Sequence, residues 1–333
     1  LSHHPEVVAA GIDSLGRNGS GACASRLVTG NHPEFAALER EIAAWKGTEA
    51  ALVFGSGYLA NAGAIPVLAE SSDLILIDEL AHACQIAGAR LSKARVVIFR
   101  HNDMAHLSEM LTVHRTGARN CLIVSEGVFS MDGDLAPLPA LVRLARQFDA
   151  WTYVDDAHAF GVLGGGRGSA KHWCVMPDVQ MGTLSKAAGS YGGYVAASRA
   201  VIDLLISRAS SFIFATGLPP ASAAAARAAL TIMKRNPAMC AAPVRAARLF
   251  AERVGLAEPQ SCIVPVVFGS VEAALAASEV LAKEGFLATA IRPPTVPNGT
   301  SRVRFTFCAD HADSDIVRLA DAVRALRQPD LAA

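Results

Sequence analysis

The sequence has no excess of charge of either sign. Its 333 residues include 30 Lys and Arg and 30 Asp and Glu, so the formal net charge is zero. Nucleic-acid-binding proteins ordinarily carry a basic surface, and interaction tails carry sustained acidic runs. We therefore expect neither function.

Long apolar runs are also missing. Hydrophobic residues make up 52% of the chain, but charged or turn-forming residues interrupt every run before the ~18 residues that span a bilayer. We expect the hydrophobic excess in a buried sheet or a subunit interface, with no membrane partner. With only 18% charged residues, the chain is also not of the disordered class.

The seven cysteines include no CxxC pair, their number is odd, and their spacing is wide. This pattern argues against a disulfide framework and against a zinc site, so we expect no metal. Free thiols in a reducing cytoplasm are the simpler interpretation. We expect no secretion signal, and because the first residue is Leu1 rather than methionine, we expect a natural start elsewhere.

No internal repeat is present; short β-rich runs instead alternate with longer helical stretches. Several runs are continuously apolar, as in strands that are covered on both faces. This rhythm predicts an α/β fold with a mainly parallel, doubly wound sheet. Expected strands are 51–54, 74–78, 96–99, 122–125, 152–155, 179–183 and 193–197, and expected helices are 59–69, 82–92, 104–114, 137–148 and 202–207.

The pattern changes after about residue 232. Helices at 242–254 and 271–283 flank a strand at 263–268, and an alternating strand at 302–307 precedes a helix at 314–326. We therefore predict a large domain over 1–232 and a smaller α+β domain over 233–333. Pro237 lies near this boundary, inside a long Ala-rich helical region.

Lys186 is the first candidate catalytic residue. It follows an apolar strand and precedes three glycines, in the run GTLSKAAGSYGG (182–193). A lysine among small residues beyond a buried strand can be desolvated, which favours the neutral amine that forms Schiff bases. Taken alone, the residue is more often a solvated lysine in a turn.

Asp155 and His158 strengthen that interpretation. They close a strand in the run VDDAH (154–158), and open α/β sheets bind ligands at the carboxyl ends of their strands. A carboxylate there can keep a pyridinium nitrogen protonated, and the imidazole can bond a neighbouring ring oxygen. An ordinary strand-end turn, or a metal site, would also produce this run, but no further ligand cluster supports a metal.

A glycine-rich segment, FGSGYLAN (54–61), follows one strand and opens a helix, where a phosphate can bind. It also matches the G-x-G-x-x-A dinucleotide pattern, with Asp73 and Asp78 downstream. A nicotinamide-dependent dehydrogenase is therefore an alternative function, although this function would leave Lys186 without a role.

Other candidates are individually weaker. His82 would open a helix, where it can stack on an aromatic cofactor but more often caps or packs. Glu126 and Ser130 follow another strand. Arg304, on an alternating strand, can clamp a carboxylate bidentately or face solvent, and Arg302 lies on the same strand face.

Together these residues resemble the α-oxoamine synthases, pyridoxal-phosphate enzymes with the fold-type I scaffold. The resemblance covers nearly the whole chain. It rests on six motifs in order, SRLVTGNHP (25–33), SEGVFSMDGD (125–134), VDDAH (154–158), GVLG (161–164), GRG (166–168) and GTLSK (182–186).

The resemblance implies roles for these residues toward pyridoxal 5'-phosphate. Lys186 would bind the cofactor covalently and serve as the acid and base, with Asp155 at the pyridine nitrogen and His158 at the phenolic oxygen. The remaining implied contacts are His82 on the ring, Ser56, Gly57, Tyr58 and Thr183 at the phosphate, Thr216 at the phosphate of a neighbouring subunit, Ser130 and Glu126 beside cofactor and substrate, and Arg304 on the amino-acid carboxylate. Shared sites imply a homodimer.

The implied reaction is a decarboxylative condensation of an amino acid with an acyl thioester. The GNHP run and residues 290–300 most resemble the branch that joins L-alanine to pimeloyl-CoA or pimeloyl carrier protein in biotin synthesis. Branches that use glycine or serine are alternatives. A further alternative is an inactive partner subunit, although such subunits typically lose the lysine. The family's N-terminal arm would precede Leu1, and Glu34 and Phe35 stand where the family often has Leu-His.

Overall fold

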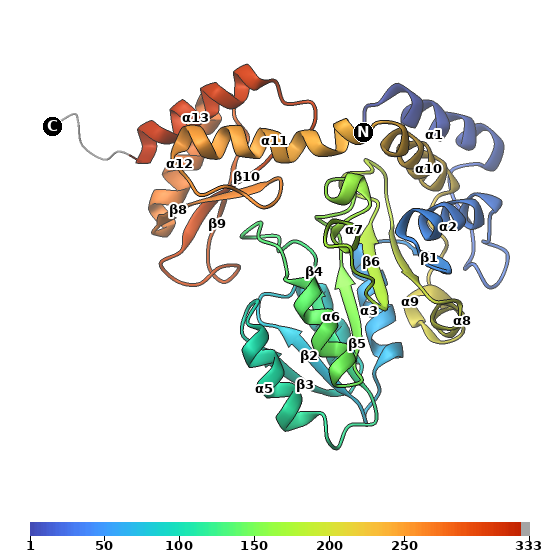
Figure 1. Ribbon diagram of the computed structural model, residues 1–333. Helices are drawn as coiled ribbons and strands as arrows, with labels where there is room; N and C mark the ends of the chain where they lie inside the picture. The colour runs from blue at the N-terminus through green and yellow to red at the C-terminus, as the bar shows by residue number, and fades with distance from the viewer. Residues whose placement is uncertain (328–333) are drawn as a thin grey trace. The chain divides into compact units, whose positions relative to one another are not determined.

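The computed structural model describes residues 1–327 (Figure 1). The chain divides into two compact units, which are described separately. The first unit comprises Leu1–Val128 and Ala136–Pro237, and the second comprises Phe129–Leu135 and the chain from Ala238 onward. The division differs from the predicted one in two respects. The boundary falls after Pro237 instead of after residue 232, and Phe129–Leu135 belongs to the second unit, which no sequence pattern indicated.

A seven-stranded sheet forms the centre of the first unit. Its order is β1 (Ala50–Phe54), β7 (Gly193–Ala197), β6 (Val179–Thr183), β5 (Trp151–Asp155), β4 (Cys121–Glu126), β2 (Leu74–Asp78) and β3 (Arg95–Phe99). Only β7 runs antiparallel to its neighbours. The predicted parallel, doubly wound sheet is confirmed, and each predicted strand lies within one residue of its observed bounds.

The sheet's apolar strands are buried because helices cover them (Figure 1). Every residue of β1, β2, β4, β6 and β7 is buried, as their continuous apolar runs indicate. Val96 and Ile98 of the edge strand β3 are exposed, as is Trp151 at the start of β5. The helices are α1 (Pro5–Asn18), α2 (Pro33–Lys46), α3 (Gly57–Leu68), α4 (Ala83–Leu91), α5 (Met104–His114), α6 (Leu138–Gln147), α7 (Ser169–His172), α8 (Arg199–Arg208), α9 (Ser210–Ile213) and α10 (Pro220–Arg235), with a 3-10 turn at Gly164–Gly166.

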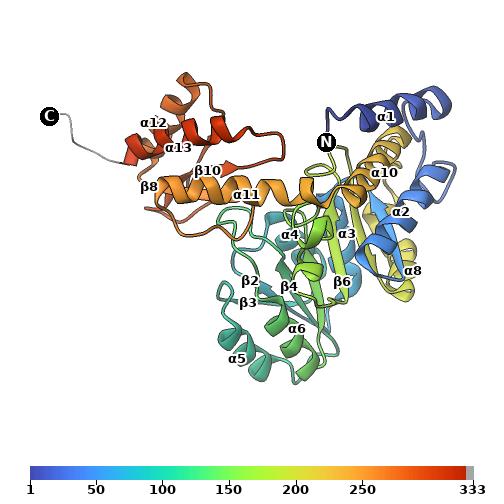
Figure 2. The same ribbon diagram turned by 45° about the horizontal axis from the view of Figure 1, so that its top comes forward.

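Proline marks the helix starts that the sequence analysis left unassigned. Pro5, Pro33 and Pro220 each stand in the first turn of a helix, where the missing N–H has no intrahelical partner to lose. Pro237 likewise begins α11 (Pro237–Val254), after α10 ends at Arg235. The Ala-rich region is therefore two helices, and placing Pro237 inside one was wrong. Figure 2 shows α1 lying along α10.

The second unit is an antiparallel sheet with helices. Its strand order is β8 (Ile263–Gly269), β10 (Ser301–Thr306) and β9 (Thr289–Ile291), and its helices are α11, α12 (Val271–Lys283) and α13 (Asp313–Arg327). Phe250 packs between Phe305 and Phe307, with ring centroids 4.9 and 5.2 Å away. The segment Phe129–Leu135 is fixed to this unit because Ser261 Oγ donates to the Gly133 carbonyl at 2.7 Å.

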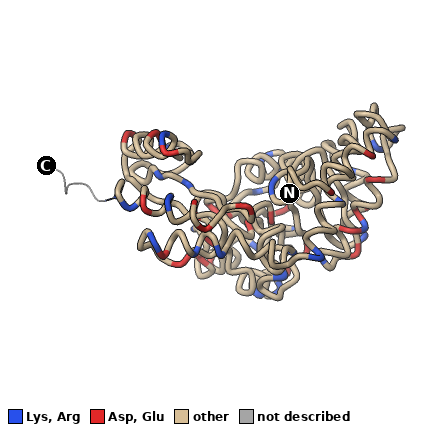
Figure 3. The backbone as a smooth tube through the Cα atoms, turned by 90° about the horizontal axis from the view of Figure 1, so that it is seen from above, with Lys and Arg blue, Asp and Glu red and all other residues tan. Residues whose placement is uncertain are grey.

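Basic and acidic residues are interspersed along the described chain (Figure 3). No helix among residues 1–327 is long and apolar enough to span a bilayer.

Candidate active site

Polar side chains gather at one edge of the large sheet, where three parallel strands end. β4 ends in Glu126, its register partner Asp155 ends β5, and β6 ends in Thr183. The turn after β6 carries Lys186. Because the strands run parallel, their carboxyl ends bring these residues to the same edge, as the sequence predicted.

Asp155 is buried and held from two sides. Its Oδ1 accepts a hydrogen bond from the Ala157 backbone N–H at 2.9 Å, and its Oδ2 accepts one from Asn61 Nδ2 at 2.7 Å. Asn61, fully buried on α3, also accepts the Tyr153 hydroxyl at 2.8 Å. Burial, and then the nearby Asp155 charge, raise the pKa of Tyr153 well above its ordinary value, so the hydroxyl stays a donor. Asn61 therefore fixes the orientation of Asp155.

Sequence reasoning missed Asn61, although it lies within the quoted glycine-rich segment. An asparagine facing the interior of a helix has no local signature for a partner 94 residues away. The same amide lies 3.1 Å from Cys84 Sγ. Burial raises the pKa of Cys84 to about 11, so this sulfur remains a thiol.

The adjacent Asp156 has a different environment. Lys46 Nζ lies 2.6 Å from its Oδ2, and Ser169 donates to the same carboxylate through its hydroxyl and its backbone N–H. Both members of the ion pair are almost completely buried. Successive side chains of an extended segment point to opposite sides, so the two neighbouring carboxylates lie in different surroundings. Asp156 pairs with Lys46 and lies away from Asn61.

Lys186 and His158 are within hydrogen-bonding distance. Lys186 Nζ lies 3.0 Å from His158 Nε2. The turn that carries Lys186 is closed by the Leu184 N–H, which donates to Gly192 O at 2.9 Å, and Gly189 adopts a φ of 63°. The lysine side chain is exposed, so the burial expected from its small neighbours was wrong. The exposed side chain can be reached by an entering ligand.

His82 caps the start of α4. Its Nδ1 accepts the Cys84 backbone N–H at 3.2 Å, and its own backbone N–H donates to Glu126 Oε1 at 2.7 Å. Desolvation lowers the pKa of His82, which favours the neutral imidazole, while the charge of Asp155 opposes this shift. The cap is the alternative considered more common from the sequence, and the residue is exposed.

Glu126 is buried beside Asp155. Burial, and secondarily repulsion from Asp155, raise the pKa of Glu126 well above 4.5. The folded protein therefore retains a proton on Glu126 that the unfolded chain releases above pH 4.5. As a consequence, this residue makes the unfolding free energy fall as pH rises from 4.5 toward the folded pKa.

Glu126→Gln should remove that dependence while keeping an oxygen for the His82 N–H. We expect the variant to gain stability relative to the wild type between pH 5 and pH 8, with a limit of about 1.4 kcal/mol per pH unit. Urea unfolding at both pH values measures the difference. The exposed Glu279→Gln is the matched control, and equal pH slopes for Glu126→Gln and wild type would refute the assignment.

The N-terminus of α3 has two backbone N–H groups without an acceptor in the described chain. Ser56 caps the helix by accepting the Leu59 N–H at 3.2 Å, and the N–H groups of Gly57 and Tyr58 have no acceptor within residues 1–327. A Cβ on Gly57 would lie 3.4 Å from Thr183 Cβ, so the helix start adjoins the end of β6. Free N–H groups and the helix dipole suit a phosphate.

Thr216 is exposed in the first unit and forms a β-bridge with Ser25. It lines a small cavity with Phe54 and Gly55, in the loop that leads to α3.

Ser130 and Arg304 belong to the second unit. Arg304 Nη1 donates to the Ser130 carbonyl at 2.9 Å and has no carboxylate partner in the described chain. Arg302, expected on the same strand face, is buried and pairs with Asp132 instead. The two arginines are therefore not equivalent, and Arg304 is the one available to an anionic ligand.

The family model for class I and II aminotransferases matches residues 2–323. The chain belongs to this family. The 8-amino-7-oxononanoate synthase of Methylocella silvestris is 57% identical over 325 residues, which cover 97% of this chain and 93% of that protein. The synthase of Methylobacterium nodulans is 57% identical over 330 residues, covering 98% of this chain and 84% of that protein.

Solved structures agree with this membership. Serine palmitoyltransferase of Sphingomonas wittichii superposes with a TM-score of 0.93 at 31% identity, covering 98% of this chain and 84% of that one. A serine palmitoyltransferase solved with pyridoxal phosphate superposes with a TM-score of 0.94 at 30% identity over the same shares. The predicted fold-type I scaffold and the α-oxoamine synthase resemblance are confirmed.

Proposed function

We propose that this protein is a pyridoxal-phosphate-dependent acyltransferase of the 8-amino-7-oxononanoate synthase type. It would join L-alanine to a pimeloyl thioester and release 8-amino-7-oxononanoate, carbon dioxide and the free thiol in biotin synthesis. The 57% identity to synthases of that name over 97% of the chain carries the proposal. The polar residues at the carboxyl edge of the sheet supply the chemistry it requires.

The described residues fit the cofactor. The free N–H groups at the start of α3, with Ser56 and Thr183, would hold its phosphate. Asp155, kept in place by Asn61 and Ala157, would pair with its ring nitrogen. His158 would bond the phenolic oxygen, and His82 would lie on the ring. When bound, pyridoxal phosphate withdraws electrons from the substrate Cα and makes its proton acidic.

Lys186 is the base in this proposal. Its amine is exposed beside His158 and is the group that would hold the cofactor and then move a proton at the substrate Cα. The Cα of alanine forms a bond to the acyl carbon, the thiol leaves, and the carboxylate departs as carbon dioxide. Glu126 is buried beside this edge, and burial raises its pKa, which disfavours a second negative charge next to Asp155.

Arg304 would hold the amino-acid carboxylate. Burial lowers the pKa of its guanidinium below the ordinary arginine value. Within residues 1–327, its guanidinium donates to the neutral Ser130 carbonyl and to no carboxylate. A charge-assisted bond to a substrate carboxylate is worth about 1.5–3 kcal/mol.

Arg304→Ala should therefore raise the KM for the amino acid by about 10- to 150-fold. Initial rates at varied amino-acid concentration and saturating thioester measure this change. Arg304→Lys keeps the positive charge but not the paired N–H donors of the guanidinium, so its KM should lie between those of the alanine variant and the wild type. An unchanged KM in the alanine variant would remove Arg304 from the substrate site.

The proposal includes a homodimer with shared sites, in which Thr216 contacts the cofactor phosphate of the neighbouring subunit. Phe214, two residues earlier, is 84% exposed, and a large apolar side chain at this position supports burial by a partner. We also propose the cytoplasm as the compartment, supported by seven cysteines that are all free.

Two other functions are less well supported. A sister activity with glycine or serine would use the same residues, but the relatives at 57% identity bear the alanine enzyme's name. A nicotinamide-dependent dehydrogenase would leave the Lys186–His158 contact without a role, and the family match opposes it.

A spectroscopic titration tests the proposal. The protein loaded with pyridoxal phosphate should absorb in the visible range, and L-alanine should shift this band at lower concentration than glycine or L-serine. A preference for glycine or serine would favour a sister activity. No visible band after adding the cofactor would contradict the proposal.

A further inference from the structure

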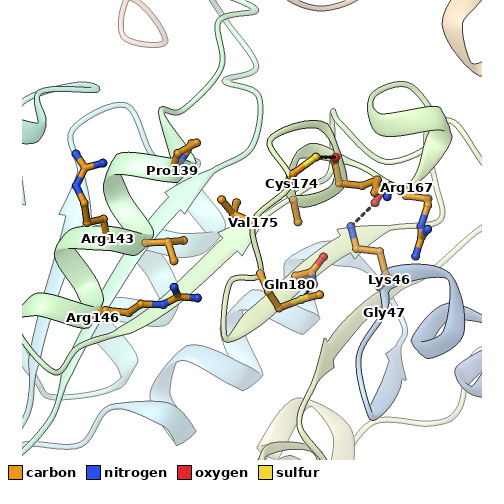
Figure 4. A pocket seen from close by; sticks show the side chains of 13 residues that line it. Lys46, Gly47, Pro139, Arg143, Arg146, Arg167, Cys174, Val175 and Gln180 are labelled. Carbon is orange, nitrogen blue, oxygen red and sulfur yellow. Dashed lines mark hydrogen bonds between the residues drawn. The ribbon is translucent and has the colours of Figure 1, made fainter.

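A basic groove lies in the first unit, between α6 and the segment that leads from η1 (Gly164–Gly166) through α7 to β6. Its volume is about 650 Å³ (Figure 4). That volume lies within the usual range for sites of small organic ligands. Five of its lining residues are basic, and none is acidic; the basic residues are Lys46, Arg143, Arg146, Arg167 and Lys171.

Three of these charges are not neutralised. Arg143 and Arg146 stand one turn apart on α6, both exposed, and no carboxylate within residues 1–327 pairs with them or with Lys171. Figure 4 shows Arg146 extending from α6 toward Gln180. Lys46 differs because Asp156 neutralises it, and Arg167 donates to the Trp45 carbonyl at 2.7 Å. Like charges one turn apart repel each other, and an anion between them would relieve that cost.

The floor of the groove is a buried amide. Gln180, in β6, is 1% exposed, its Nε2 donates to Met176 Sδ at 3.2 Å, and its Oε1 has no partner in the described chain. Burying a carbonyl oxygen without a hydrogen-bond donor costs free energy. A ligand with an N–H or O–H group would donate the missing hydrogen bond to Gln180 Oε1. Val142 and Val175 add apolar surface to the walls.

This groove is distinct from the candidate active site. Gln180 is the second residue of β6, whereas Thr183 ends that strand and precedes Lys186. α6 leads back from the carboxyl end of β4 toward the start of β5, so its last turn, with Arg146, lies at the opposite edge of the sheet from Asp155.

We propose that this groove binds a phosphate-bearing small molecule of nucleotide size. The phosphates would bind Arg143, Arg146 and Lys171 through charge-assisted hydrogen bonds, and the body of the ligand would lie on the valines and donate to Gln180. The basic residues supply affinity for the anion, and the amide distinguishes a nucleotide from a bare phosphate.

Calorimetric titration of the pyridoxal-phosphate-loaded protein with ADP and with inorganic pyrophosphate tests this site. Loading occupies the phosphate position at α3. Wild type should bind both probes, more weakly at high salt. Arg143→Gln/Arg146→Gln should weaken both by about tenfold or more, because each loses charge-assisted bonds. Gln180→Met should weaken ADP alone.

The matched control is Arg90→Gln/Arg199→Gln, which removes two exposed charges elsewhere on the first unit and should leave both affinities unchanged. Thermal unfolding of each variant verifies that it is folded. Absence of binding by the wild type, or equal binding by Arg143→Gln/Arg146→Gln and wild type, would overturn the proposal. Failure here leaves the acyltransferase proposal intact, since no groove residue is assigned to that reaction.

Discussion

Lys186→Ala should lose the visible absorption of the bound cofactor and nearly all turnover. The exposed amine follows the carboxyl end of β6, and its Nζ lies 3.0 Å from His158 Nε2. A positioned acid or base alone contributes about 10²- to 10⁴-fold to a rate, and loss of the covalent attachment adds to that effect.

Absorption spectra and single-turnover rates measure the two losses separately. Lys283→Ala is the control, because it removes an exposed lysine from the end of α12 in the second unit. The control should retain both the spectrum and the rate. If Lys186→Ala turned over at the wild-type rate, the assignment of the base would be wrong.

Lys46→Met should have the largest effect on stability. It leaves the Asp156 carboxylate buried without its cation, and breaking a buried ion pair by removing one partner costs about 3–5 kcal/mol. The Ser169 contacts compensate for only part of this cost. Urea unfolding near neutral pH measures the change.

The double variant Lys46→Met/Asp156→Asn separates charge from packing. It removes both charges while the asparagine oxygen still accepts from Ser169, so it should be more stable than Lys46→Met alone. A loss below about 1 kcal/mol in Lys46→Met would show that the pair is not the buried contact described, since exposed pairs contribute that little.

Sequence patterns predicted the large sheet well because its strands are buried on both faces. Continuous apolar runs such as 74–78 and 122–125 leave little ambiguity when helices separate them. The parallel order also brings strand ends together, so the clustering of Glu126, Asp155 and Lys186 followed from topology alone. Helices that begin at Pro5 and Pro33 were not assigned, although proline in a first turn was a usable signal.

Contacts between distant residues could not be predicted in this way. Nothing local distinguishes Asp155 from Asp156, yet Asn61 bonds the first and Lys46 the second. The burial of Arg302 depends on Asp132, 170 positions earlier in the chain. The basic groove likewise combines residues from α2, α6 and α7, whose separate sequences appear as ordinary surface charge.

Product analysis tests the central claim most directly. The purified protein would be loaded with pyridoxal phosphate and incubated with pimeloyl-CoA and, in turn, L-alanine, glycine and L-serine, with the products identified by mass spectrometry. The account predicts 8-amino-7-oxononanoate and one equivalent of carbon dioxide from L-alanine, and far slower reaction with the other two. Faster condensation of glycine or serine, or no condensation of any of the three by fully loaded protein, would contradict it.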